Sequence, residues 1–351
     1  MAERGKTRPD PRSGEREGAV TSTMVARAAN VSQSTVSLVL SGKSAGRVSA
    51  ATRSLVEETA RQLGYRPNVS AQTLRTGIVK TLAFAVPDLQ QPFFGQVLYA
   101  AELFACQHGY NIILIDTLAD ADWAGRLLQM FNSHTIAGCI VYASDKETER
   151  RLAPMQDHVV YIEADDEALS GIDLNTARVM KTVAEHLTAL GHRRIGYLAA
   201  RYPRALFQRR FDSFVEQLAL LGVAFAPQRR LFSRFGVEEA TACALQLLEN
   251  DITAVVCDDD LLAGALYRAA RKMGKSIPGD LSVIGFNDVE IARLLSPELT
   301  TIAIPAEEIG QRSVALLLAQ LGPSHARESR TKPAILDLHL RLRGSTGPLA
   351  K

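Results

Sequence analysis

Residues 20–77 read VTSTMVARAANVSQSTVSLVLSGKSAGRVSAATRSLVEETARQLGYRPNVSAQTLRTG, and this stretch decides how the chain is organised. The small apolar residues Val25, Ala28 and Ala29 recur at helical spacing, and a break begins at Asn30. The spacing predicts one short helix that ends in a tight turn.

A second short helix follows the turn. Ser32 can cap it by accepting a hydrogen bond from an orphan amide near Ser34 or Thr35. Its apolar face consists of Val36, Val39 and Leu40. Two short helices joined by a tight turn fit a helix-turn-helix, whose second helix lies in the DNA major groove.

A third helix is predicted between an N-cap at Ser49 and a stop at Gly64. Its apolar positions are Leu55, Val56, Ala60 and Leu63. Three short helices around one small core are typical of a DNA-binding headpiece. A plain three-helix bundle at the start of an enzyme shows the same spacing, so the pattern alone leaves both interpretations open.

The amino-acid sequence of this stretch resembles the headpiece of the LacI/GalR family of bacterial transcriptional repressors. The matching segments are VARAANVSQSTVSLVLSGK (25–43), RVS (47–49) and LGYRPN (63–68). In that family LGYRPN leads into a hinge helix, which implies a hinge helix here in VSAQTLRTG (69–77). Leu74 matches the family leucine that inserts into the minor groove and bends the duplex, although a flexible linker would also tolerate it.

The resemblance and the helix positions together predict the DNA contacts. Gln33 and Ser34 lie on the first turn of the second helix, and Leu38 follows Ser34 by four residues on the same face. The family commonly has a polar residue where Leu38 stands. Leucine can contact a thymine methyl group but cannot bond guanine; a core position is the alternative. The predicted contacts are Thr21, Ser32, Gln33, Ser34, Thr35, Ser37, Leu38, Asn68, Ala71 and Leu74.

Length and composition fit one small and one large unit. The chain has 351 residues, 46% of them hydrophobic and 22% charged, as in ordinary soluble globular proteins. The sequence has no run of about 18 apolar residues, so no membrane-spanning helix is predicted. The charged N-terminus has no apolar signal-peptide segment, so we expect a disordered arm at residues 1–19 and a cytoplasmic, nucleoid-associated protein.

Charge is distributed unevenly along the chain. Residues 1–80 contain 13 Lys and Arg against 6 Asp and Glu, whereas the remainder contains 27 against 32. A basic first unit on an acidic body suits contact with phosphate, although a solvated basic surface is also compatible. The four cysteines are widely separated and show no zinc-binding spacing, so no metal and no cofactor is expected.

From Thr81 onward, predicted strands and helices alternate. Strands such as TLAFAVP (81–87) and RIGYLAA (194–200) alternate with helical runs such as Trp123–Asn132 and Val237–Leu248, in two consecutive series. This pattern predicts an α/β core of two doubly wound parallel-sheet lobes with a cleft between them. No glycine-rich nucleotide-binding motif opens either series.

The core also resembles the effector core of the LacI/GalR family, which is similar to periplasmic sugar-binding proteins. The matching segments are VPDLQQPFF, HLTALGHRRIGYLA, VVCDDDLLAGAL, IPGDLSVIGFND, LSPELTTIAIPAEEIG and RLRGSTG. The resemblance implies three crossings between lobes, near Thr176, Thr301 and His325.

The predicted organisation has four parts: an arm at 1–19, a headpiece at 20–67, a hinge at 68–78 and a core at 79–351. Within the core, the predicted N-terminal lobe comprises 79–176 and 302–324, and the C-terminal lobe comprises 177–301 and 325–351.

Ligands of open parallel sheets bind beyond the carboxyl ends of the strands. Asp88 and Glu163 follow strands of the first series there, and Asp258, Asp259 and Asp260 follow one of the second. The resemblance adds apolar contacts at Phe93 and Phe94, an aromatic platform at Phe235, and polar contacts at Arg210 and Asp260. Arg204, which lies one loop before Arg210, is a further predicted contact. Phe94 can instead be plain core, and Asp258 or Asp259 can simply cap a helix. Ile304 stands where the family often has a glutamine.

An aromatic platform with Arg and Asp side chains suits a sugar-like effector. We therefore expect a dimeric repressor, not an enzyme, that binds a two-fold symmetric double-stranded operator under control of that effector. The alternative is a sugar-binding protein or an enzyme on the α/β core, with an accessory helical domain. No heptad-repeat tail follows RGSTG, so a homodimer is expected. The effector's identity and the operator sequence cannot be read from these residues.

Overall fold

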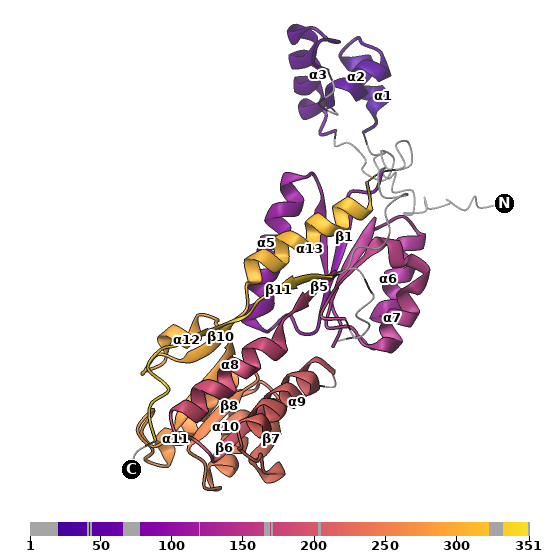
Figure 1. Cartoon of the computed structure of the whole chain (residues 1–351). Helices are drawn as coiled ribbons and strands as arrows, with labels where there is room; N and C mark the ends of the chain where they lie inside the picture. The colour runs from indigo at the N-terminus through magenta and orange to yellow at the C-terminus, as the bar shows by residue number, and fades with distance from the viewer. Residues whose placement is uncertain are drawn as a thin grey trace, which may run out of the picture. The chain divides into compact units, whose positions relative to one another are not determined.

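The computed structural model of the chain separates into two compact units, Met1–Ile78 and Val79–Lys351 (Figure 1). It describes residues 20–65 except 41 and 43, 78–118, 120–164, 169, 171–202, 205–322 and 333–349. The predicted arm, the predicted DNA contacts Asn68, Ala71 and Leu74, and the predicted effector contact Arg204 lie outside the described residues.

The described residues of the first unit form the three predicted headpiece helices, α1 (Ser22–Ala28), α2 (Gln33–Leu40) and α3 (Ala50–Gln62). Each begins at a hydroxyl cap. The Thr35 amide donates to Ser32 Oγ at 3.1 Å and the Thr52 amide to Ser49 Oγ at 3.1 Å, while Thr21 accepts from Met24. These bonds satisfy amides that have no partner within a helix.

The headpiece core consists of Val25, Ala26, Ala29, Val36, Val39, Val56 and Ala60. Two residues of the predicted apolar faces are instead exposed. Ala28 faces solvent and Ala26 takes the buried position, while Leu55 on α3 is 51% exposed. Each helix turns about 100° per residue, so a buried stripe that includes Val56 and Ala60 leaves Leu55 outside it.

In the second unit, the N-terminal lobe is a parallel sheet with the order β11-β5-β4-β3-β1-β2. Helices α5 and α13 pack against one face, and α6 and α7 pack against the other. The strands are β1 (Thr81–Val86), β2 (Asn111–Asp116), β3 (Gly138–Tyr142), β4 (Val159–Ile162), β5 (Gly171–Leu174) and β11 (Ala334–Leu336). The helices are α5 (Pro92–Gln107), α6 (Trp123–Asn132), α7 (Lys146–Leu152), the 3₁₀ turn η1 (Ala153–His158) and α13 (Ala306–Gln320).

The C-terminal lobe has the order β12-β10-β9-β8-β6-β7, and only β12 runs antiparallel to its neighbour among the described pairs. Helices α8 and α9 cover one face of its sheet, and α10 and α11 cover the other. The strands are β6 (Ile195–Ala200), β7 (Arg230–Ser233), β8 (Ala254–Cys257), β9 (Ser282–Asn287), β10 (Thr300–Ala303) and β12 (His339–Arg341). The helices are α8 (Thr176–Ala189), α9 (Ala205–Leu220), η2 (Pro227–Arg229), α10 (Val237–Leu248), α11 (Asp260–Lys272) and α12 (Ile291–Leu294).

The chain crosses between the lobes three times, but two crossings differ from the prediction. The first lies at Asn175, between β5 and α8. The second follows β10, at Ile304 and Pro305 rather than at Thr301, because Thr301 still pairs within the C-terminal sheet. The third lies between β11 and β12 rather than near His325, because Ala334–Leu336 pairs with β5 in the N-terminal sheet.

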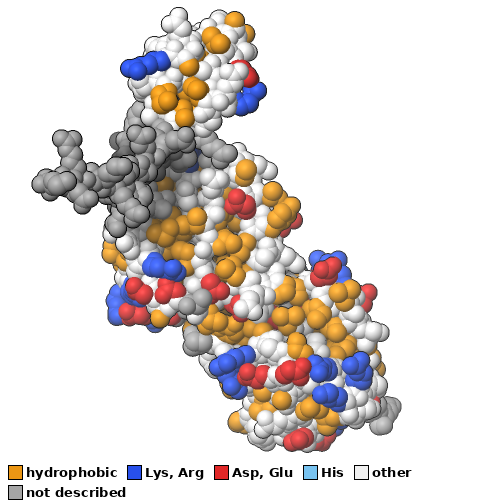
Figure 2. Space-filling model, turned by 180° about the vertical axis from the view of Figure 1, so that it is seen from behind, with side chains coloured by type: hydrophobic (Ala, Val, Ile, Leu, Met, Phe, Trp, Pro, Cys, Tyr) orange, Lys and Arg blue, Asp and Glu red, His pale blue; other side chains and the backbone are white. Residues whose placement is uncertain are grey.

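The surface of the second unit mixes charged and apolar side chains. In Figure 2, basic and acidic side chains alternate over the lobe at the bottom of the view, and hydrophobic side chains reach the surface in both lobes. The well-exposed apolar residues include Tyr99, Leu103, Leu114, Leu294 and Leu342. Among the described helices, none combines the length and the apolar character that crossing a membrane requires.

Candidate functional site

A cleft lies where the two sheets change winding direction. In the N-terminal lobe β1 lies between β2 and β3, and in the C-terminal lobe β6 lies between β7 and β8. The loops after such strands diverge to opposite faces of the sheet and leave a crevice at the carboxyl ends. The cleft encloses about 550 Å³, including its open mouth. Its lining residues are Pro87, Asp88, Gln91, Phe93, Phe94, Tyr142, Ala143, Tyr202, Leu206, Phe207, Arg210, Phe235, Asp258, Asp259, Asn287 and Ile304.

Aromatic rings form both walls of the cleft. On the N-terminal lobe, Phe93 and Phe94 from the first turn of α5 contact Tyr142 at the end of β3, with ring centroids 5.1–5.9 Å apart and edge-to-face geometry. On the C-terminal lobe, the rings of Tyr202 and Phe235 lie 5.1 Å apart. Walls of this kind can hold the apolar faces of a ring-shaped ligand.

Arg210 supplies the buried positive charge of the cleft. The residue is only 4% exposed, and its guanidinium lies 3.5 Å from the ring centroid of Phe286. Its Nη1 donates to the backbone oxygen of Asp258 at 3.0 Å. The Asp258 carboxylate in turn accepts from the Tyr197 hydroxyl at 2.6 Å and from the Ala200 amide at 2.9 Å. Burial raises the pKa of Asp258, while the Arg210 charge opposes that rise.

Two buried polar atoms of the cleft lack partners among the described residues. They are Oε1 of Gln91, an acceptor, and Nε of Arg210, a donor. Gln91 is 6% exposed, so water access to its amide is limited. Because unpaired buried polar groups are costly, these atoms are the natural places for a bound ligand to donate and to accept.

A hydrogen bond between Tyr202 and Asp88 joins the two lobes across the cleft. The Tyr202 hydroxyl, which follows β6, donates to Asp88 Oδ2 at 2.6 Å, and Asp88 follows β1. Burial and the Asp88 carboxylate both raise the pKa of Tyr202, so its hydroxyl keeps the proton that it donates.

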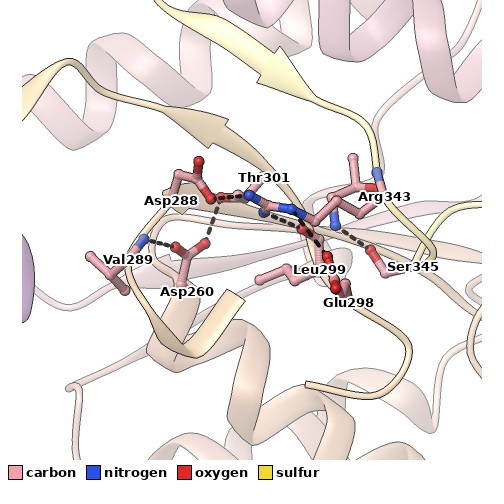
Figure 3. A network of polar contacts seen from close by, with 9 residues as sticks. Asp260, Asp288, Val289, Glu298, Leu299, Thr301, Arg343 and Ser345 are labelled. Atoms are coloured by element: carbon pink, nitrogen blue, oxygen red, sulfur yellow. Dashed lines mark hydrogen bonds and ion pairs between the residues drawn. The ribbon is translucent and has the colours of Figure 1, made fainter. Parts of the chain in front are cut away.

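Five predicted effector contacts line the cleft, and two do not. The five are Asp88, Phe93, Phe94, Arg210 and Phe235. Glu163 is absent from the lining because its carboxylate turns inward and accepts from the Leu174 amide at 2.6 Å. Asp260 is also absent: it is fully buried and accepts from the Thr301 hydroxyl at 2.6 Å (Figure 3).

The sequence reasoning missed several lining residues. Asp259 is not among the predicted effector contacts, although it follows β8 together with Asp258 and Asp260; it caps α11 by accepting from the Leu261 amide at 2.6 Å, and it also lines the cleft. Asn287, Tyr142 and Tyr202 end or follow buried strands, which is the same signal that singled out Asp88. The strand-end rule therefore could have found them.

Three buried carboxyl groups of the core keep their protons up to about neutral pH, because burial raises their pKa values. Burial raises the pKa of Glu163 to about 8, of Asp259 to about 7 and of Asp260 to about 8. In the unfolded chain these groups titrate near about pH 4. Between these values the folded state holds protons that the unfolded state releases, so stability is lost as pH rises.

We therefore expect the melting temperature to fall as the pH is raised from about 5 to about 9, by several degrees. The melting temperature of Glu163→Gln, whose amide resembles the protonated acid, should fall less over the same pH range. Glu147→Gln alters an exposed carboxyl on α7 and should follow the parent. Parallel curves for the parent and Glu163→Gln, measured by differential scanning calorimetry, would show that Glu163 does not titrate in this window.

In the headpiece, α2 presents a polar, exposed first turn. Ser32, Gln33 and Ser34 are exposed, and Gln33 Nε2 donates to Ser22 Oγ at 2.9 Å. Of the other predicted DNA contacts, Thr21 is exposed, and Thr35, Ser37 and Leu38 are half-buried. The buried residues of α2 are Val36 and Val39. The predicted contacts therefore avoid the buried stripe.

No group of three or more potential ligands for a metal ion occurs among the residues that the structure describes.

Two family models match the chain. Residues 24–68 match the bacterial regulatory proteins of the lacI family, and residues 184–346 match the periplasmic binding protein-like domain.

The similarity to three known proteins extends over 77–95% of the chain. The HTH-type transcriptional repressor CytR of Escherichia coli (strain K12) is 30% identical over 343 residues, which cover 95% of this chain and 98% of the relative. The lac repressor dimer bound to operator and the anti-inducer ONPF has a TM-score of 0.83 at 26% identity, covering 95% of this chain and 100% of that one. A LacI family regulator from Enterococcus faecium with bound ribose has a TM-score of 0.67 at 25% identity, covering 77% and 100%.

A helix-turn-helix headpiece joined to a two-lobed core with a ligand-sized cleft defines a class, the transcriptional regulators with a DNA-binding and an effector-binding domain. The chain belongs to the LacI family of bacterial regulatory proteins. It is therefore a transcriptional regulator of the repressor type and not an enzyme. This confirms the predicted family, fold class and function class.

Proposed function

We propose that the chain is a homodimeric repressor that binds a two-fold symmetric DNA operator through α2 and responds to a small sugar-like effector held in the cleft. The polar first turn of α2 supports the operator role, since recognition helices contact base edges with their N-terminal residues. The related lac repressor was solved as a dimer on its operator. Such a protein acts in the bacterial cytoplasm, on nucleoid DNA.

The observation that carries the effector role is the pair of unpartnered atoms, Gln91 Oε1 and Arg210 Nε, in an aromatic-walled cleft. A hydroxyl group donates to the first and accepts from the second, while the rings cover an apolar face. The related regulator with bound ribose supports a sugar. Six aromatic side chains line the cleft, which favours a second candidate, a nucleoside with a flat base.

Exposed apolar residues support the homodimer. Tyr99 and Leu103 on α5 are 69% and 48% exposed, and Leu114 on the edge strand β2 is 49% exposed. Covering a surface of this kind with a second copy removes it from water.

A thermal-shift screen of the purified chain tests the effector role, with ribose, cellobiose, galactose, adenosine and cytidine as probes. We expect one of these to raise the melting temperature of the parent by several degrees at saturating concentration. Phe235→Ala, which removes a ring of the cleft, should lose the shift, and Phe232→Ala, on the same lobe outside the cleft lining, should keep it. A shift that Phe235→Ala retains would place the binding site elsewhere.

A further inference from the structure

The Gln33 side chain is held by a residue of the preceding helix. Gln33 is the first residue of α2, and its Nε2 donates at 2.9 Å to the Oγ of Ser22, the first residue of α1. Gln33 is exposed and Ser22 is half-buried. The two residues are eleven positions apart, so the bond depends on how the two helices pack and not on residue spacing within one helix.

The packing of α1 against α2 fixes the position of the Ser22 hydroxyl. Thr21 caps the helix that carries Ser22, and Val25 of that helix lies in one buried cluster with Val36 and Val39 of α2. The oxygen of a serine side chain is set by one torsion, whereas the amide of a glutamine side chain is set by three. The hydroxyl is therefore the fixed partner, and the bond selects the orientation of the amide.

The neighbouring Ser34 is held from within α2 itself. Its Oγ lies 2.7 Å from the Oγ of Ser32, the same hydroxyl that accepts from the Thr35 amide at 3.1 Å. Both exposed polar side chains of this turn thus have a partner without DNA, and of the two, Gln33 is the one whose partner lies in another helix. Side chains that are oriented in advance lose less conformational entropy on binding.

The bond to Ser22 changes what the Gln33 amide can offer to a base. A glutamine amide has two N–H donors and one carbonyl acceptor, and Ser22 uses one of the donors. The remaining N–H and the Oε1 match the major-groove edge of adenine, which presents the N7 acceptor and the N6 amino donor. Guanine presents two acceptors, N7 and O6, and would require both N–H groups. The held amide therefore suits adenine and disfavours guanine.

We propose that Ser22 is a positioning residue for DNA readout: by accepting one N–H of Gln33, it makes Gln33 select adenine over guanine at the base pair that Gln33 faces. This inference rests on the proposed operator binding through α2. It adds a residue of α1 to the determinants of sequence preference, and that residue acts through Gln33. Loss of the hydroxyl frees the second N–H and the rotation of the amide, so guanine becomes an acceptable partner.

The test compares the affinity of the full chain for two duplexes that differ at one base pair, A·T or G·C. Selection on a randomised library supplies the duplex, and the base pair is the one at which Gln33→Ala loses its preference. We expect the parent to favour A·T there by about 5- to 150-fold. Ser22→Ala should reduce this preference by about 2- to 10-fold. Its affinity for a random duplex should stay near that of the parent, because no charge changes.

Three further variants separate positioning from other roles of Ser22. Ser22→Thr keeps the hydroxyl and should keep the parental preference. Thr23→Ala is the matched control, since it removes an exposed hydroxyl from the next residue of α1, and it should also keep the preference. In the Gln33→Ala background, Ser22→Ala should cause no further change, because residues that act as a unit are not additive.

A parental preference in Ser22→Ala overturns the proposal, and so does a loss of equal size in Ser22→Thr. An effect of Ser22→Ala that is the same with and without Gln33 also overturns it, because Ser22 would then act without Gln33. A parent that selects no sequence contradicts the proposed function and this inference with it. A parent that selects a sequence, together with an unchanged preference in Ser22→Ala, contradicts this inference alone.

Discussion

Replacing Arg210 with alanine is expected to abolish the effector response while leaving operator affinity within about twofold. Arg210 is buried in the cleft and is not in the headpiece. Losing a charged hydrogen-bond partner costs about 1.5–3 kcal/mol, which weakens effector binding about 10- to 100-fold. The measurement is operator binding by fluorescence anisotropy, titrated with the probe that the thermal-shift screen selects.

Removing Arg210 also leaves the Asp258 carboxylate without its buried cation, which destabilises Arg210→Ala for a reason unrelated to the ligand. Arg210→Lys keeps the charge but lacks the planar guanidinium and its Nε donor. It should fold and still respond poorly. Arg268→Ala, on the surface of the same lobe, should respond like the parent. A parental titration curve for Arg210→Lys would contradict a ligand contact through Nε.

Replacing Leu38 with arginine is expected to change which base pair the headpiece prefers. Leu38 is half-buried on α2, whereas Val36 and Val39 fill the core. Leucine favours contact with a thymine methyl group, and arginine bonds guanine O6 and N7. The preference at the facing base pair should move from A·T to G·C by about 1–3 kcal/mol, which is about 5- to 150-fold.

Selection of both proteins on a randomised duplex library measures this change. Leu55→Arg is the matched control, since Leu55 is an exposed leucine of α3 in the same headpiece. It adds the same charge and should strengthen binding to all sequences without changing the preferred one. An unchanged preference at every position in Leu38→Arg would show that Leu38 does not face the groove.

The sequence predicted the long elements well because their apolar spacing repeats over many residues. The predicted helices at Trp123–Asn132 and Val237–Leu248 match α6 and α10 in both boundaries. The strands β5 and β7 were not predicted, because each has four residues and carries a charged one, Asp173 or Arg230. Such segments have no period long enough to separate a strand from a loop.

The site was predicted only in part, and the reason differs from the one that applies to the short strands. Three consecutive aspartates follow β8, and their number alone does not show which of them faces the cleft. Asp259 is still extended, with φ of −159°, and Asp260 is the first residue of α11. The change of backbone conformation between them sends the two side chains in different directions. Only the residue at which the helix begins decides between them, and helix ends are the least certain feature of a sequence pattern.

The third crossing shows a limit of another kind. β11 is three residues long, and its place in the N-terminal sheet depends on pairing with β5, more than 150 residues earlier in the chain. Its side chains show no alternation that distinguishes the two sheets. Long-range pairing of so short a strand follows from the folded lobes rather than from local propensity.

The central claim is that occupancy of the cleft controls binding to a specific operator. The most direct measurement is the affinity of the full chain for a duplex selected from a randomised library, with and without the probe that stabilises the chain. The account predicts a two-fold symmetric selected sequence, and an affinity that the probe changes at least about fivefold in the parent but not in Arg210→Lys. An affinity that is the same at zero and saturating probe would contradict it.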